Sequence, residues 1–225
     1  MLNDSLLERA LRWLLGHIGE AQVLSARRQF EEATGPILEG APDYESRIAH
    51  FFEQYLCGAA QGERAPLGRF AEQAPELSQE DRTQLAGWLR SHRSLFAFEG
   101  WEPESRLGRV RDLWLGGTYR VCGRPEDRQL AQGDRFDGRL IAVSGSLWLS
   151  PGRVFHPRAA HGAIDELLQG IGEGRSDTAG FLNGLLRMRA RYYQFESIRA
   201  EHVYRLDALP EPAFAAPWAS PARRR

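Results

Sequence analysis

Lysine is missing from this chain of 225 residues, so all 29 basic side chains are arginine. Asparagine occurs only at Asn3 and Asn183, and methionine only at Met1 and Met188. This composition is expected when a GC-rich genome disfavours AT-rich codons, so clusters of arginine arise without any function. The 30 acidic residues leave a net charge of −1, which excludes a protein that coats nucleic acid or anionic membrane by bulk charge.

Cysteine and long apolar runs are also scarce. Cys57 and Cys122 form no C-x-x-C motif, which favours a reducing compartment over a disulfide framework. No apolar run approaches the ~18 to 20 residues that span a bilayer, and the N-terminus lacks a basic region followed by an apolar one. We therefore expect a cytoplasmic protein without membrane insertion.

Residues 1–92 have the pattern of a helical domain with an aromatic-rich interior. Ser78 and Asp81 have the spacing of a capping box for its last helix. Apolar residues recur at helical intervals in the first helix, at Leu7, Leu11, Leu14, Leu15 and Ile18.

The pattern changes to short β-like runs in residues 93–157, at 95–98, 110–114, 119–122, 136–143 and 147–149. Gly116-Gly117 and Ser144-Gly145 have the form of two-residue hairpin turns. An open sheet this small would leave exposed edges, so we expect a small antiparallel β-barrel-like module, either SH3-like or OB-like.

Residues 158–205 return to helical spacing, which predicts C-terminal helices that pack on the preceding modules. The apolar seam of the longer helix consists of Phe181, Leu185, Met188, Tyr192 and Phe195. Residues 206–225 contain several prolines and end in three arginines, which indicates a flexible tail. The fold class that these parts predict is α+β.

No complete catalytic, metal or cofactor motif is present, so no catalytic residue, metal or cofactor is predicted. His50 and Cys57 could share a helix face, but a small buried thiol is the ordinary role of such a cysteine. His156 and His161 are five residues apart and lack a third metal ligand. Gly170–Gly174 would follow a helix, where a phosphate-binding loop follows a strand.

The hairpin around Gly116-Gly117 is the most specific feature of the sequence. A two-residue turn places Trp114 opposite Tyr119, and Asp112 opposite Val121 on the apolar face. A buried aspartate needs backbone N–H groups or an arginine, so Asp112 is either a structural brace or a functional acid. Four arginines would share the other face: Arg109, Arg111, Arg120 and Arg124.

This arginine face is either a binding surface for an anionic partner or a plain solvated surface. An exposed aromatic beside the arginines, Trp101 or Trp148, would favour binding. The formal charge is −5 for residues 1–92, +3 for residues 93–158 and +1 for residues 159–225. The positive charge therefore belongs to the β module.

The motif Arg111-Asp112-Leu113-x-x-Gly116, continued by Tyr119-Arg120-Val121 and Gly133-Asp134, resembles an uncharacterised bacterial family. In that family a helical N-terminal half precedes an R-D-L-x-x-G strand pair. The resemblance implies the two-part architecture over residues 28 to 160 and brings no catalytic residues with it.

Three functional hypotheses remain. The first is a non-enzymatic cytoplasmic adaptor or regulatory protein that acts through protein-protein interaction with an unidentified partner. The second is nucleic-acid binding by the arginine face of the hairpin at residues 106–124. The third is an enzyme with an unrecognised site, for which Asp112 and His156 would be the first residues to inspect.

Overall fold

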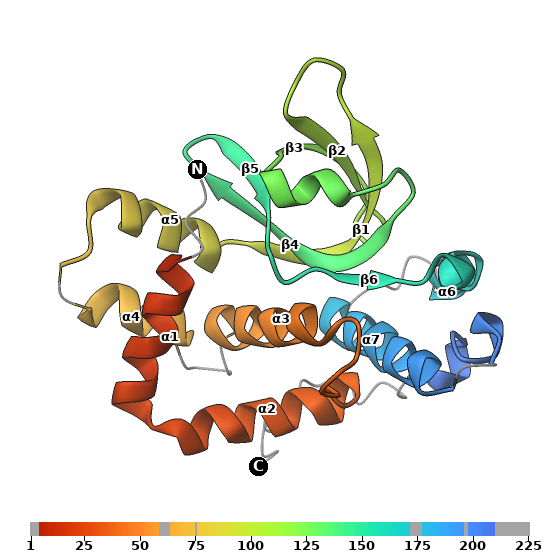
Figure 1. Ribbon diagram of the computed structural model, residues 1–225, viewed down its shortest axis with the longest axis horizontal. Coiled ribbons are helices and arrows are strands. Elements are labelled where there is room, and N and C mark those ends of the chain that lie inside the picture. Colours follow the sequence, from red (N-terminus) through yellow and green to blue (C-terminus); the bar gives the residue numbers. More distant parts are fainter. Residues whose placement is uncertain (1–4, 59–63, 75, 172–176, 196–197, 210–225) are drawn as a thin grey trace, which may run out of the picture.

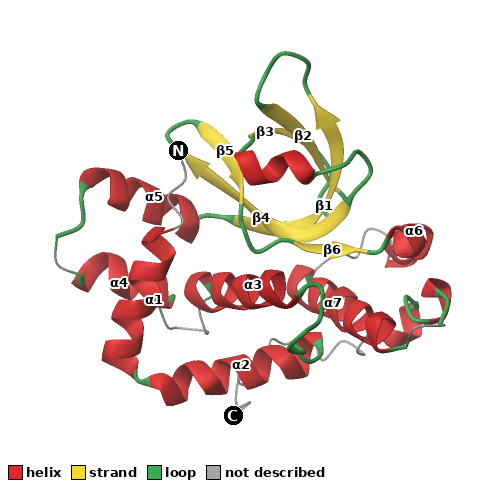
Figure 2. Ribbon diagram, viewed as in Figure 1, coloured by secondary structure: helices red, strands yellow, loops and turns green. Residues whose placement is uncertain are grey.

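The computed structural model describes residues 5–58, 64–74, 76–171, 177–195 and 198–209, and it is an α+β protein, as predicted (Figures 1 and 2). Its helices are α1 (Ser5–Ile18), α2 (Glu20–Thr34), α3 (Tyr44–Cys57), α4 (Pro66–Gln73), α5 (Gln79–Leu89), α6 (His161–Ile171) and α7 (Thr178–Gln194). Its strands are β1 (His92–Trp101), β2 (Leu107–Asp112), β3 (Thr118–Cys122), β4 (Arg135–Val143), β5 (Ser146–Leu149) and β6 (Val154–His156). Short 3₁₀ turns are η1 (Pro125–Gln129), η2 (Arg158–Ala160), η3 (Ala200–His202) and η4 (Leu206–Ala208).

The strands form one mixed sheet in the order β1-β2-β3-β5-β4-β6. β1 also pairs with β4, from His92 opposite Leu140 to Ala97 opposite Arg135, so the pairings return to the first strand. β3 and β5 pair in parallel at Cys122 and Trp148, whereas the other pairings are antiparallel. The prediction of a wholly antiparallel module is therefore wrong at this pairing, and β6 was not predicted.

Strands β1 to β5 surround an apolar cluster. Along β2 the side chains alternate, with Val110 and Asp112 buried and Arg109 and Arg111 exposed, as the pleat of a strand requires. The buried members of the cluster are Phe96, Phe98, Val110, Val121, Leu130, Phe136, Leu140 and Leu149.

The helices lie on one side of the strands, with α3 and α7 next to them and α2 farther away (Figure 1). Helices α1, α4 and α5 share an apolar cluster with Ile141 and Val143 of β4. Helices α6 and α7 share another with Leu95 and Trp114, whose indole stacks on Phe181 at 4.4 Å between centroids. These two groups of helices therefore cover the sides of β1 and β4 that face them.

Most of the local structures that the sequence predicts, such as caps and turns, are present. The Ser78 hydroxyl and the Asp81 carboxylate form the predicted capping box of α5. Ser144-Gly145 is the predicted two-residue turn, with φ values of 49° and 78°. Phe195, predicted in the seam of the last helix, follows the end of α7 and is 52% exposed. The first helix buries Leu6, Ala10 and Leu14, while Leu15 is 40% exposed.

A buried ion pair lies where the strands meet the helices. Arg93 of β1 donates from Nε and Nη2 to the two Asp137 oxygens of β4, at 2.9 and 2.5 Å. Burial alone would raise the pKa of Asp137, but the charge and hydrogen bond of Arg93, together with His50 and His156, hold that pKa below its usual value. His50 of α3 donates from Nδ1 to the Gly152 carbonyl at 2.7 Å, and burial lowers its pKa to about 4.

Glu53, one turn farther along α3, is also buried. The Gly152 N–H donates to Glu53 Oε1 at 2.5 Å. Burial raises the pKa of Glu53 to about 7. A Cβ at Gly152 would lie 2.7 Å from this carboxyl group and 2.7 Å from the backbone nitrogen of His50, so the close approach requires glycine. We call Arg93, Asp137, His50, Glu53 and Gly152 the polar seam.

Some predictions concern residues that the structure does not describe. Residues 210–225 of the predicted tail and 172–174 of the predicted glycine-rich linker lie outside the described ranges. At the start of the tail, Leu206–Ala208 form η4. Among the described helices, none combines the length and the apolar character needed to cross a membrane.

Candidate functional site

The hairpin of β2 and β3 places three of the four predicted arginines on one exposed face. Arg109 lies directly opposite Arg120, and Arg111 lies opposite Thr118. The predicted register was wrong: the loop contains five residues, 113 to 117, and Val110 instead of Trp114 faces Tyr119. Each residue of β3 pairs four positions earlier on β2 than predicted, and because this displacement is an even number, the assignment of side chains to faces survives.

The hydrogen bonds of Asp112 account for a loop of five residues between β2 and β3 where a two-residue turn was predicted. Its Oδ1 accepts the backbone N–H groups of Trp114 and Leu115, both at 2.8 Å, which turns the chain before the two glycines. Oδ1 also accepts from Ser94 Oγ at 2.6 Å, and Oδ2 accepts from His92 Nε2 at 2.8 Å. Burial opposes ionisation of Asp112, but these donors hold its pKa below the usual value. These are the contacts that the interpretation as a structural brace requires.

Acidic residues at the end of β1 neutralise much of the arginine face. Arg120 donates to both Glu102 oxygens at 2.7 and 2.6 Å, and this pair lowers the pKa of Glu102. Arg111 pairs with Glu99 at 3.5 Å. Arg109 forms no ion pair with any residue that the structure describes. The face is therefore a mixture of charges, and exposed pairs of this kind contribute little to stability.

Arg124, the fourth predicted arginine, is not on this face. It is 5% exposed, and its backbone N–H donates to Asp127 Oδ2 at 2.9 Å. The other oxygen of Asp127 accepts from Arg153. The prediction that Arg124 shares the hairpin surface was wrong, because β3 ends at Cys122 and η1 turns the chain inward.

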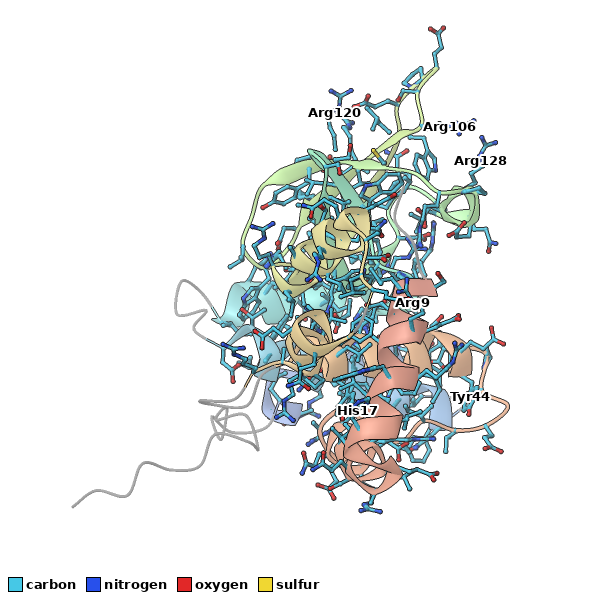
Figure 3. All side chains as sticks on the ribbon, turned by 90° about the vertical axis from the view of Figure 1, so that its left-hand side faces the viewer. Arg9, His17, Tyr44, Arg106, Arg120 and Arg128 are labelled. Atoms are coloured by element: carbon cyan, nitrogen blue, oxygen red, sulfur yellow. The ribbon has the colours of Figure 1, made fainter. Side chains whose placement is uncertain are left out.

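A second basic surface lies at one end of the strands, in a groove of about 470 Å³. Its lining consists of Trp101, Ser105, Arg106, Gly123, Arg124, Pro125 and Arg128, which we call the Trp101 groove. Arg106 and Arg128 are exposed and form no ion pair with described residues. Figure 3 shows them on one side of the β module, away from Arg120.

Trp101 is held in this groove by two glycines. A Cβ at Gly123 would lie 2.4 Å from the Trp101 ring, and one at Gly108 would lie 3.1 Å from it. The indole is half-buried, and it also packs on Phe98 at 5.1 Å between centroids. Trp148, the other aromatic considered, packs against the cluster of α1, α4 and α5. Trp101 is thus the aromatic that accompanies arginines.

His156 and Cys57, the candidate histidine and cysteine, are both held in apolar surroundings that shift their pKa values. His156 is buried, its Nδ1 lies 3.2 Å from the Tyr204 hydroxyl, and burial lowers its pKa to about 3. Burial raises the pKa of Cys57 to about 11, so its thiol stays protonated. Within the described residues, no three His, Cys, Asp or Glu side chains form a group that could hold a metal ion.

In the comparisons with known proteins, no family model, curated protein or solved structure matches this chain. The resemblance to an uncharacterised bacterial family stays a prediction.

Proposed function

We propose that this is a non-enzymatic interaction protein whose β module binds an acidic segment of a partner protein in the Trp101 groove. The observation that carries the proposal is the pair of exposed arginines, Arg106 and Arg128, that flank a half-buried indole without an acidic partner among the described residues. Tryptophan and arginine dominate the energetic centres of protein interfaces. The free thiols of Cys57 and Cys122 are compatible with a reducing cytoplasm.

The charge distribution favours a short acidic segment over a long polyanion. Among the described residues that line the Trp101 groove none is acidic, whereas Glu99 and Glu102 already pair with two arginines of the hairpin. A guanidinium matches a carboxylate through two parallel hydrogen bonds, so two arginines suit two carboxylates on one segment.

A second candidate function is the binding of single-stranded nucleic acid. The observation in its favour is the return of the strand pairings to β1 and the parallel pairing of β3 with β5. We propose that this ring is a small barrel of the OB-like kind, because a parallel pairing fits its Greek-key order better than an SH3-like one. Such barrels commonly bind oligonucleotides on strands 2 and 3, where Arg109, Arg111 and Arg120 lie.

One titration separates the two candidates. Fluorescence anisotropy would compare a 12-residue peptide of Glu, Asp and Leu, the same peptide with Gln and Asn in place of the acids, and a 12-nucleotide oligothymidine. The proposal predicts that the acidic peptide binds and that Arg106→Gln with Arg128→Gln weakens it at least ~10-fold. The matched control is Arg12→Gln with Arg28→Gln, two exposed arginines on α1 and α2.

If the control variant also loses binding of the acidic peptide, or if the neutral peptide binds as tightly as the acidic one, the Trp101 groove is not the binding site that we propose. Nucleic-acid binding predicts instead that oligothymidine binds most tightly and with a steep salt dependence. Substitution of Arg109, Arg111 and Arg120 together should then reduce the salt slope by up to ~3. A pull-down from native lysate that recovers no stoichiometric protein partner would count against the interaction protein.

A further inference from the structure

A cavity of about 490 Å³ lies among the helices, bounded by α1, α2, α3 and the start of α4, and we call it the helical cavity. Figure 2 shows α3 between α2 and the strands, so the space between α2 and α3 lies away from the sheet. The helical cavity shares no described residue with the Trp101 groove. Protein interiors contain few voids larger than a water molecule, whereas ligand sites commonly have this size.

Helix α2 leaves this space because the face that it turns to the other helices carries small and polar side chains. A helix that packs on its neighbours usually has large apolar residues along such a face. Apart from Phe30, the residues of α2 that line the cavity are small or polar and share one helix face: Gln22, Ser25, Ala26, Gln29 and Ala33. The sequence of α2 therefore keeps the cavity open instead of filling it.

The other helices give the cavity an apolar and aromatic wall. Leu14 of α1, Phe51 and Tyr55 of α3, and Phe30 of α2 all line it. The rings of Phe30 and Phe51 pack at 5.5 Å between centroids, and those of Phe51 and Tyr55 stack at 6.0 Å with an angle of 26° between their planes. Such a wall suits the flat body of an aromatic molecule, which can pack on these rings.

The lining does not offer a ligand an available charge. Among the described residues that line the helical cavity, Arg64 and Arg69 are the charged ones. Arg64 pairs with Glu72, and Arg69 also has an interaction partner. An ionised ligand would lose its hydration here without gaining a counter-charge, which costs far more than the same transfer of an uncharged molecule. The cavity therefore favours an uncharged ligand.

Two half-buried donors in the lining lack a partner within the part of the chain that the structure describes. Asn183 of α7 accepts from Arg93 Nη1 through its Oδ1 at 3.0 Å, but its amide nitrogen donates to no described residue. The Tyr55 hydroxyl has no hydrogen bond with a described residue either, and because burial raises its pKa it keeps its proton. A ligand that brings a hydrogen-bond acceptor can satisfy these donors.

We infer that the helical cavity binds an uncharged aromatic molecule that carries a carbonyl or a similar acceptor. The rings of Phe51 and Tyr55 contact its body, and Asn183 or the Tyr55 hydroxyl donates to its acceptor. A carboxylate would accept from the same donors, but they restore less than its lost hydration. This small-molecule site is separate from the proposed protein-binding groove and does not depend on it.

The probe for this inference is 6-propionyl-2-(dimethylamino)naphthalene, an uncharged fluorescent ketone. Two analogues change one feature each: 6-propyl-2-(dimethylamino)naphthalene has a methylene in place of the carbonyl, and 6-(dimethylamino)-2-naphthoate carries a carboxylate. We expect the full chain to bind the ketone with 1:1 stoichiometry, and to bind the carboxylate at least ~10-fold more weakly at pH 8. A carboxylate that binds as tightly as the ketone, or a ketone that does not bind at its solubility limit, overturns the ligand class.

Two variants of α2 locate the binding. Ser25→Phe adds a ring to a side chain that lines the cavity and should weaken the ketone at least ~10-fold. Leu24→Phe, at a 45% exposed position on the same helix, should leave the affinity within about 2-fold. Arg106→Gln with Arg128→Gln, which changes only the Trp101 groove, should also leave it unchanged. Unchanged binding in Ser25→Phe, in protein that keeps its thermal midpoint, overturns the location.

Two nearly isosteric variants keep the test decisive if Ser25→Phe does not fold. Tyr55→Phe removes only the hydroxyl, and Asn183→Asp keeps an oxygen for Arg93 but loses the amide donors. At least one of them should weaken the ketone about 3- to 10-fold, as expected for the loss of one uncharged hydrogen bond, and the propyl analogue less than about 2-fold. Tyr44→Phe, on the same helix as Tyr55, is the matched control and should change neither. Unchanged ketone affinity in both variants, or equal effects on both ligands, overturns the role of the donors.

Discussion

The buried carboxyl group of Glu53 leads to a pH dependence that can be worked out from the structure. Burial raises the pKa of Glu53 from 4.5 to about 7, although the charges of Arg139 and Arg153 oppose the rise. Between these two values the folded chain holds a proton that the unfolded chain has released. The contribution of Glu53 to the free energy of unfolding therefore falls as the pH rises from 4.5 through 7.

The magnitude follows from the width of that window. Each unit of pKa difference corresponds to about 1.36 kcal/mol. Integrated from pH 5 to pH 8, the shift of the Glu53 pKa to about 7 amounts to a loss of about 2.5 kcal/mol. His50 and His156, whose pKa values burial lowers, contribute in the opposite direction as the pH rises toward 6.5. The pH dependence of the wild-type free energy of unfolding would therefore combine the contributions of Glu53, His50 and His156.

Glu53→Gln isolates the contribution of the carboxyl group. The amide keeps an oxygen for the Gly152 N–H but cannot lose a proton, while His50 and His156 titrate in both proteins and cancel in the difference. Urea denaturation followed by tryptophan fluorescence at pH 5, 6, 7 and 8 gives the free energies. Relative to the variant, the wild type should lose about 2.5 kcal/mol across this range.

The control is Glu45→Gln, an exposed position on the same helix. Its difference from the wild type should stay constant between pH 5 and 8. A constant difference for Glu53→Gln as well, or one that grows in favour of the wild type at high pH, would refute the reasoning.

Three further substitutions test the packing and the buried charges. Gly152→Ala should lower the free energy of unfolding, measured by urea denaturation, by about 1 to 3 kcal/mol because its Cβ would meet atoms at 2.7 Å. Its control, Gly162→Ala, lies in open space on α6 and should be neutral or stabilising. Arg93→Met should cost about 3 to 5 kcal/mol because it strands the buried Asp137, and adding Asp137→Leu should recover most of that loss in a double-mutant cycle. Asp112→Ala should cost about 3 kcal/mol in the same assay by leaving two backbone N–H groups without an acceptor, and Asp112→Asn should lose less.

The sequence predicted the faces of the strands better than their registers. Alternation along β2 placed Val110 and Asp112 inside and Arg109 outside, and an error of four residues in register does not change a pattern with a period of two. The loop length could not be predicted from the Gly-Gly pair, because the Asp112 carboxylate turns the chain at Trp114.

The Trp101 groove was harder to predict from the sequence than the faces of the strands. The sequence indicates Trp101 as an aromatic that could accompany arginines, but it does not single out Arg106 and Arg128. Arg106 lies in a loop and Arg128 in η1, 22 positions apart in the sequence, so no periodicity relates them. The signal that could have indicated the site is the pair Gly108 and Gly123, since a large ring packed on two neighbouring strands needs glycine beneath it.

Arg93 lies just after the position where the composition changes from helical to β-like, and its guanidinium contacts both the strands and a helix. It contacts Asp137 in the strands and Asn183 in α7, while His50 of α3 lies beside the same carboxylate. A division of the chain at residue 92 would leave the Arg93–Asp137 pair whole but would remove the His50 ring that lies beside its carboxylate. The change in composition therefore coincides with no gap in the packing of the described residues, because Ile141 and Val143 of β4 also share an apolar cluster with α1, α4 and α5.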